Sequence, residues 1–307
     1  MPRKSLIIIV VVAVVGIAAM LWIVRSGSRA DLLTPAMEHL TSTESFSAGV
    51  AVDLVFDSSG VAVPLRISGA GEFAYPDDGA MLASADMSVT AGFPSMKVMD
   101  AAVRLADDGR LYTMLDGLPQ DLDSIIDVEG FNGAWFSLGE SALSLLLPWV
   151  MEGAEAGEGA EDMLGGGTSV FRPGPRFDDT IMEGVPVAHY RLSVDRDNLA
   201  FLLTTLTRSV QGRICTEDEK IGIRDIVASR EFIVDAWIDK RQDRFYLIKV
   251  VAVPLGEDEG ASPVGITVKF TGFDIPVEVV SPDDARPLSI VLARLLRVSA
   301  SSVGDGQ

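Results

Sequence analysis

The chain has few of the side chains that bind metals or act as nucleophiles. Its 307 residues include one cysteine, Cys215, and two histidines, His39 and His189, which lie far apart in the sequence. A single cysteine excludes an intrachain disulfide and a cysteine-rich zinc cluster, and it leaves the redox compartment open. No metal-ligand pair has the spacing of a known motif. The sequence therefore predicts neither a metal nor a cofactor.

Basic residues are also scarce. Lysine and arginine number 25 against 44 aspartates and glutamates, which gives a net charge of −19. A nucleic-acid-binding protein needs a basic stripe to neutralise phosphates, so we expect no nucleic acid partner. The same negative charge opposes steady docking on an anionic lipid surface.

Catalytic motifs are missing as well, since the sequence contains neither a nucleophile elbow nor a phosphate-binding loop. His189 stands beside Tyr190 in an expected strand, and Cys215 lies in a charged stretch with no histidine near it in the sequence. We expect structural roles for both and predict no enzymatic activity. An envelope hydrolase is one alternative function, but it would require a clustered acid, base or nucleophile that the sequence does not show.

An apolar run without charge occupies residues 6–24 and ends at Arg25. At about 1.5 Å per residue, a helix of this length spans the roughly 30 Å hydrocarbon layer of a membrane. No small-x-small cleavage site follows the run, so we interpret it as an uncleaved signal anchor. The alternative is a long signal peptide. Basic residues flank both ends, and charge alone therefore leaves the membrane orientation weakly defined.

The clearest fold signal lies late in the chain. Phe232, Val234, Ala236 and Ile238 alternate with positions that include Glu231, Asp235 and Asp239, which predicts a strand with one buried face. The polar run 239–244 then indicates a hairpin into a second apolar strand. A third strand at 264–270 and a short extended piece at 276–280 complete an expected antiparallel meander.

Upstream of this meander, short strands follow one another with few helices between them, which favours antiparallel pairing over βαβ units. We expect strands at 46–57, 61–75, 81–91, 96–106, 110–115, 134–136 and 187–194, and helices at 31–42, 195–210 and 288–298. We interpret 118–130 as an irregular loop, 141–151 as an apolar helix, 152–167 as an acidic glycine-rich loop, 173–175 as a turn and 216–220 as a polar charged stretch. The predicted class is α+β, mainly antiparallel β.

Several short motifs stand out in the chain: Trp237-Ile238-Asp239, the turn 273–277 and the segment 282–285, with earlier pieces at 110–112, 133–136 and 184–195. Together they resemble the motifs of the LolA/LppX/LprG group of bacterial envelope lipid carriers. The resemblance spans roughly residues 43–285. It implies a strongly curved half-barrel sheet with helices on its concave face. The lipobox cysteine of the group is absent near the N-terminus, so we expect the helix at 6–24 to hold the protein at the membrane.

The motifs and the apolar run together predict an organisation along the chain. We expect residues 1–5 to be a short tail, 6–24 a transmembrane signal anchor, 25–42 a juxtamembrane linker with a short helix, 43–298 a LolA-like half-barrel domain, and 299–307 a disordered tail. The short N-terminal tail and the resemblance favour a single-pass protein of the cell membrane whose main domain is extracytoplasmic.

The resemblance implies a non-covalent binding site for a lipid or another hydrophobic molecule, with an envelope protein as a further partner. The candidate residues are apolar: Phe46, Val52, Leu54, Phe56, Val234, Ile238, Ile266, Val268 and Phe270 line the cavity, with Leu146 and Trp149 as a lid. The alternative is that these side chains fill the core themselves. The protein would then be a structural or regulatory sensor protein of the envelope with the same fold.

Overall fold

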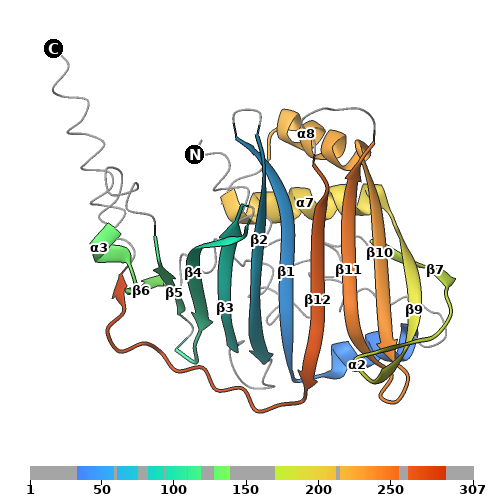
Figure 1. The fold of residues 1–307 in the computed structure, drawn as a ribbon, viewed down its shortest axis with the longest axis horizontal. Helices are drawn as coiled ribbons and strands as arrows, with labels where there is room; N and C mark the ends of the chain where they lie inside the picture. Colours follow the sequence, from blue (N-terminus) through green and yellow to red (C-terminus); the bar gives the residue numbers. More distant parts are fainter. Residues whose placement is uncertain are drawn as a thin grey trace. The chain divides into compact units, whose positions relative to one another are not determined.

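Figure 1 shows the chain as a computed structural model. The structure describes residues 33–58, 61–74, 82–92, 94–108, 110–118, 128–138, 170–211, 215–255 and 262–287. Outside these ranges lie the expected anchor at 6–24, the apolar helix at 141–151 with Leu146 and Trp149, the acidic loop, the helix at 288–298 and the tail at 299–307. No helix within the described ranges is long and apolar enough to cross a membrane.

The described strands are hydrogen-bonded into a large, mostly antiparallel sheet. Contacts between residues divide the chain into two compact units. Unit 1 comprises residues 1–43, 50–62 and 145–271, and unit 2 comprises residues 44–49, 63–144 and 272–307. Strand β1 (Ser45–Ser58) contributes residues to both units.

Unit 1 contains the late meander. Its strands are β7 (Phe171–Arg176), β8 (Thr180–Met182), β9 (Val185–Val194), β10 (Arg230–Asp239), β11 (Arg244–Pro254) and β12 (Val264–Phe273). They are hydrogen-bonded in the order β12-β11-β10-β9-β7, and β8 also pairs with β9. The strands expected at 187–194, from 231 onward and at 264–270 are confirmed.

The β10–β11 hairpin forms because local polar groups close its turn. The backbone N–H of Asp243 donates to the carbonyl of Asp239 at 2.9 Å, and a carboxylate oxygen of Asp239 accepts from the N–H of Arg241 at 2.8 Å. A bulge between Trp237 and Ile238 shifts the register, so that Ile238 pairs with Phe245.

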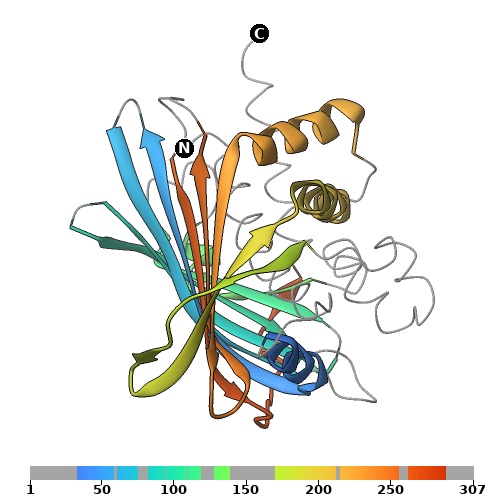
Figure 2. The ribbon, with the colours of Figure 1, turned by 90° about the vertical axis from the view of Figure 1, so that its right-hand side faces the viewer.

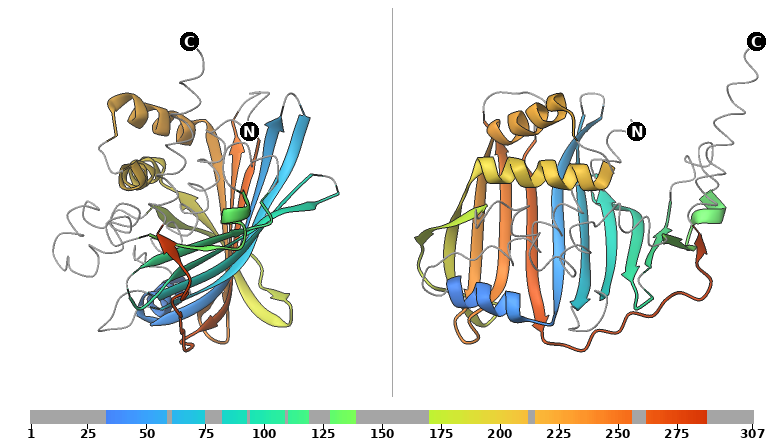
Figure 3. Two further views of the ribbon diagram at one scale, coloured as in Figure 1. Left: turned by 90° about the vertical axis from the view of Figure 1, so that its left-hand side faces the viewer. Right: turned by 180° about the vertical axis from the view of Figure 1, so that it is seen from behind.

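Three helices belong to unit 1: α2 (Leu33–Ser42), α7 (Arg196–Gln211) and α8 (Glu217–Ala228). Figures 2 and 3 show α2 and α7 on the same side of strands β9 to β12, near opposite ends of those strands. Asp195 starts α7 by accepting a hydrogen bond from the N–H of Asn198 at 3.1 Å. The helices expected at 31–42 and 195–210 are therefore confirmed over their described residues.

Unit 1 differs from the sequence-based expectation in two places. The polar charged stretch from Thr216 begins helix α8 through a capping box in which Thr216 and Glu219 each bond the other's backbone N–H. Residues 173–175, expected as a turn, lie inside β7. The two prolines remove N–H donors, and the pairing of β7 with β9 is irregular between Pro173 and Arg176. A strand can hold them because it is the last in the described order.

Unit 2 is an antiparallel meander with one parallel addition. It contains most of β2 (Val61–Ala74), then β3 (Leu82–Ala91), β4 (Met96–Leu105), β5 (Leu111–Asp116), α3 (Val128–Phe131), β6 (Trp135–Leu138) and β13 (Arg286–Pro287). The order is β13-β6-β5-β4-β3-β2, and β13 runs parallel to β6. The strands expected at 61–75, 81–91, 96–106, 110–115 and 134–136 are confirmed over their described residues. The extended piece expected at 276–280 pairs with no described strand, so it does not complete the meander. Part of the loop expected at 118–130 is instead the short helix α3.

The turn at 273–277 that carries part of the family resemblance has a local structural role in unit 2. Asp274 adopts a left-handed conformation with φ 53°. Its N–H donates to the carbonyl of Ser45 at 2.7 Å, and the Ser45 hydroxyl donates to the carbonyl of Ile275 at 2.5 Å. Reciprocal bonds of this kind fix the chain as it leaves β12 and satisfy polar groups of a buried serine.

Candidate functional site

One face of the unit 1 sheet is apolar across four strands. Val234 of β10 lies opposite Leu192 of β9 and Val250 of β11, and Val250 lies opposite Ile266 of β12. We call this surface the apolar face and define it by its register positions: Ala188, Tyr190 and Leu192; Phe232, Val234, Ala236 and Ile238; Ile248, Val250 and Ala252; Val264, Ile266, Val268 and Phe270.

Burial is uneven across the apolar face. Val234, Ala236 and Ile238 have no exposed surface, and Ile248 and Val268 are also buried. Phe232, Val250 and Ile266 are partly exposed although they are apolar and lie on the same face. The protein therefore fills one part of this face with its own side chains and leaves solvent-accessible apolar surface on the other.

The helices of unit 1 also bury apolar side chains. Leu33, Ala36 and Leu40 of α2 are buried, and α2 contacts β11. Ala200 of α7 is buried. Because a helix presents side chains at intervals of three and four residues to one side, Leu33, Ala36 and Leu40 form the packed stripe of α2.

The structure brings together most of the predicted lining residues that it describes. Val234, Ile238, Ile266, Val268 and Phe270 share the apolar face. Phe270 also lies against Phe245, with ring centroids 6.1 Å apart.

The predicted residues of β1 divide between the units. Val52 is buried and Leu54 is partly exposed, both in unit 1, whereas Phe46 belongs to unit 2 and stacks on Phe73 with centroids 5.0 Å apart. Phe56 lies in β1, but its side chain is outside the described part of the structure, as are Leu146 and Trp149.

Tyr190 is the polar side chain of the apolar face. It is 4% exposed and lies opposite Ala236 in the register. Its hydroxyl is buried and has no hydrogen-bond partner among the described residues, a property shared there with Nδ1 of His39 in α2. The guanidinium of Arg176 lies over the Tyr190 ring, 5.8 Å from the centroid.

The opposite face of the same strands carries a polar and aromatic cluster. His189 stacks between Trp237, at 4.5 Å between centroids, and Phe177, at 4.7 Å. Its Nε2 lies 3.0 Å from Oδ1 of Asp235. The guanidinium of Arg191 donates to the same oxygen at 3.1 Å and to Oδ2 of Asp235 at 3.3 Å. We call these five residues the aromatic cluster.

The charge of Asp235 is stabilised by its partners. Burial raises the pKa of its carboxyl. Hydrogen bonds from Arg191 and His189, together with the charge of Arg191, lower that pKa by more than burial raises it, so the net pKa is below the usual value. In the described part of the chain no hydroxyl or thiol hydrogen-bonds to His189. The cluster therefore has the geometry of a structural network and lacks a nucleophile.

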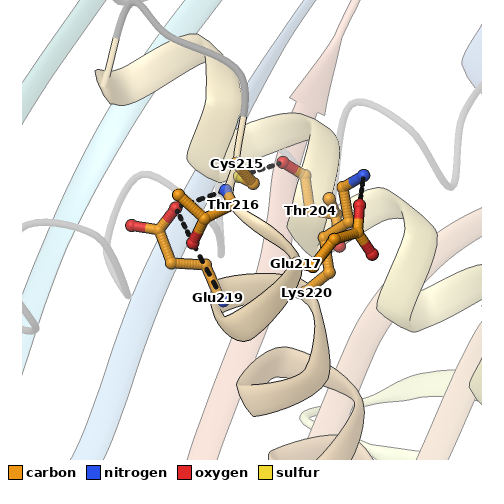
Figure 4. Close-up of polar contacts among 6 residues, drawn as sticks. All are labelled: Thr204, Cys215, Thr216, Glu217, Glu219 and Lys220. Atoms are coloured by element: carbon orange, nitrogen blue, oxygen red, sulfur yellow. Dashed lines mark hydrogen bonds and ion pairs between the residues drawn. The ribbon is translucent and has the colours of Figure 1, made fainter.

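Other candidate chemical groups are separated from one another. The thiol of Cys215 is buried at the start of α8 and lies 3.5 Å from the carbonyl of Thr204 in α7 (Figure 4). Within the described ranges, no group of three or more histidine, cysteine, aspartate or glutamate side chains is placed to hold a metal ion.

No protein-family model and no curated protein match the chain. Among solved structures it is similar to the Mycobacterium tuberculosis lipoprotein LppX, with 11% identity, a TM-score of 0.37, and coverage of 81% of this chain and 98% of that one. A DUF1329 family protein from Desulfovibrio piger has 8% identity and a TM-score of 0.23, covering 80% of this chain and 93% of that one. A porin-like protein from Bacteroides uniformis has 10% identity and a TM-score of 0.21, covering 73% and 95% respectively.

Proposed function

We propose that the chain is a membrane-anchored, extracytoplasmic binding protein for a lipid or another hydrophobic molecule, and that it acts without a covalent step. The observation that supports this proposal is the partly exposed apolar surface of Phe232, Val250 and Ile266 in unit 1. A ligand that covers such surface gains about 0.8 kcal/mol for each methylene it buries.

The sequence supports the location of this activity. The apolar run at 6–24 would hold the domain near the bilayer, where long-chain lipids are abundant. The net charge of −19 disfavours close approach to anionic lipid surfaces. Uptake would accordingly favour neutral lipids or require an envelope protein partner.

Ligand capture tests the proposal. The full chain, purified in a mild detergent from a membrane-containing lysate, is expected to retain lipid in native mass spectrometry and to bind a fluorescent fatty acid at micromolar concentration. Val250→Lys is expected to weaken that binding at least about tenfold, because it places a charge on the accessible apolar surface. Val61→Lys is the matched control, since Val61 in β2 is 62% exposed and lies off the apolar face.

Three results would refute the proposal: purified protein free of lipid, failure to bind the fluorescent fatty acid, or equal binding by both lysine variants. The alternative function, a structural or sensor protein of the envelope, is favoured by the complete burial of Val234, Ala236 and Ile238. That alternative predicts no ligand uptake and a domain whose stability is unaffected by lipid.

A further inference from the structure

The hydroxyl of Tyr190 is an anomaly in the apolar face. A polar group removed from water without a hydrogen bond costs free energy, and most buried polar atoms in folded proteins are paired. Tyr190 is 4% exposed, and no described residue pairs its hydroxyl. A phenylalanine would fill almost the same volume without that cost, so packing alone does not account for the tyrosine.

The neighbours of Tyr190 explain why its hydroxyl lacks a partner among the described residues. Strand parity places the side chain on the apolar face, opposite Ala236, which has no atom beyond Cβ to offer. Arg176 contacts the face of the ring and directs an N–H to Asp179 at 2.9 Å. The remaining groups near Tyr190 in the register are Ala188 and Leu192, which carry no polar side-chain atom.

Resting on the proposed function, we infer that the Tyr190 hydroxyl is the polar anchor of the bound molecule. It donates a hydrogen bond to an oxygen acceptor, a carboxylate or a carbonyl, at one end of a long-chain ligand. The chain of that ligand then lies along the apolar face toward Val250 and Ile266, where apolar surface is accessible. The site would thus select amphipathic molecules over plain hydrocarbons, because only the former satisfy the buried donor.

The two proposals are separated by using three probes with the same tail and fluorophore: pyrene-labelled hexadecanoic acid, its methyl ester, and hexadecylpyrene. The variant is Tyr190→Phe, and the control is Tyr246→Phe. Tyr246 lies on the polar side and its hydroxyl already donates to Glu183 at 3.0 Å. All measurements use the full chain in a mild detergent.

Tyr190→Phe is expected to weaken binding of the acid, the ester or both by about 3- to 10-fold, the loss that corresponds to one hydrogen bond. Weakening of the acid alone identifies a carboxylate as the partner, and weakening of both identifies a carbonyl. Binding of hexadecylpyrene is expected to stay unchanged, and Tyr246→Phe is expected to alter none of the three affinities.

The unfolding temperature of the lipid-free protein provides a second readout. Tyr190→Phe is expected to leave it unchanged or raise it, since the variant removes an unpaired buried hydroxyl. A lower unfolding temperature would show that the hydroxyl has a partner within the protein, and would overturn the inference. Equal affinity of wild type and Tyr190→Phe for all three probes would also overturn it while leaving the proposed function intact. If wild type binds no probe, the proposed function fails and the anchor with it.

Discussion

The imidazole of His189 lies parallel to the indole of Trp237, with 7° between the ring planes and 4.5 Å between the centroids. The two residues are direct partners in the register of β9 and β10. Phe177 closes the other side of the imidazole, and Asp235 holds its Nε2. The stack thus ties the segment after β7 to both strands on the face opposite the candidate binding site.

His189 is expected to stabilise unit 1 through both its ring and its hydrogen bond. His189→Ala removes two ring contacts and one bond, and we expect it to cost about 1–3 kcal/mol. His189→Phe keeps a ring between Phe177 and Trp237 and is expected to cost about half as much or less. Urea unfolding monitored by tryptophan fluorescence measures both, and equal losses would show that the stack contributes nothing.

Acid is expected to weaken the fold through Asp235. Its pKa is lower in the folded protein than in the unfolded chain, so its contribution is complete above the unfolded value, about 3.9. That contribution disappears as the pH falls through the lower, folded pKa. Wild type should therefore lose stability as the pH falls below about 4, and Asp235→Asn should lose less over the same interval. Parallel curves for the two proteins would contradict this assignment.

Two glycines provide a matched pair for backbone packing. A Cβ at Gly174 in β7 would lie 2.3 Å from the carbonyl oxygen of Arg191, whereas a Cβ at Gly222 in α8 meets nothing within 4 Å. Gly174→Ala is expected to destabilise by about 1–3 kcal/mol. Gly222→Ala is expected to stabilise by roughly 0.5–1 kcal/mol, because alanine is the better helix former. Thermal unfolding of both variants measures the difference, and a reversed order would contradict the β7 geometry.

The capping box of α8 can be tested with the single thiol next to it. Thr216→Ala removes the cap and is expected to cost about 0.5–2 kcal/mol, which should raise the labelling rate of buried Cys215 about 2- to 30-fold. The control is Lys220→Ala, which removes an exposed ion pair with Glu217 at 2.7 Å and should change that rate by less than about twofold. Equal labelling of all three proteins would show that α8 opens independently of its cap.

Residues 6–24 are expected to remain in the mature protein. The reason is the long apolar run that leads directly to Arg25 without a small-x-small site. N-terminal sequencing of membrane-fraction protein provides the measurement, and a variant with an Ala-x-Ala site inserted after residue 24 serves as the positive control for cleavage. A native start near residue 28 to 31 would contradict the prediction.

The sequence predicts best where the pattern is local. Alternation at Phe232, Val234, Ala236 and Ile238 predicts β10 and its buried side, because a strand exposes successive residues to opposite faces. Burial in the structure confirms that side for Val234, Ala236 and Ile238. Once β10, β11 and β12 are paired, the same alternation places Val268 of β12 on the face that carries Ala236 of β10.

Features that depend on distant pairing are not visible in the sequence. His189 and Asp235 are 46 residues apart and meet only through the register of β9 and β10. Local signals can also mislead. Pro173-Gly174-Pro175 predicts a turn because proline and glycine usually punctuate structure, yet these residues lie in β7. The helix from Glu217 has few apolar residues and so no clear helical periodicity, although the Thr216–Glu219 pair is a recognisable capping signal.

The prolines of β7 affect how copies of this protein could pair their strands with one another. Pro173 and Pro175 leave the last strand of the described order without two N–H donors, and its pairing with β9 is irregular. A strand from another molecule would find an incomplete set of hydrogen-bonding groups there. Copies of a tethered domain, as proposed here, meet repeatedly in the plane of a membrane. The interrupted edge would then keep colliding neighbours from joining their sheets into a fibre.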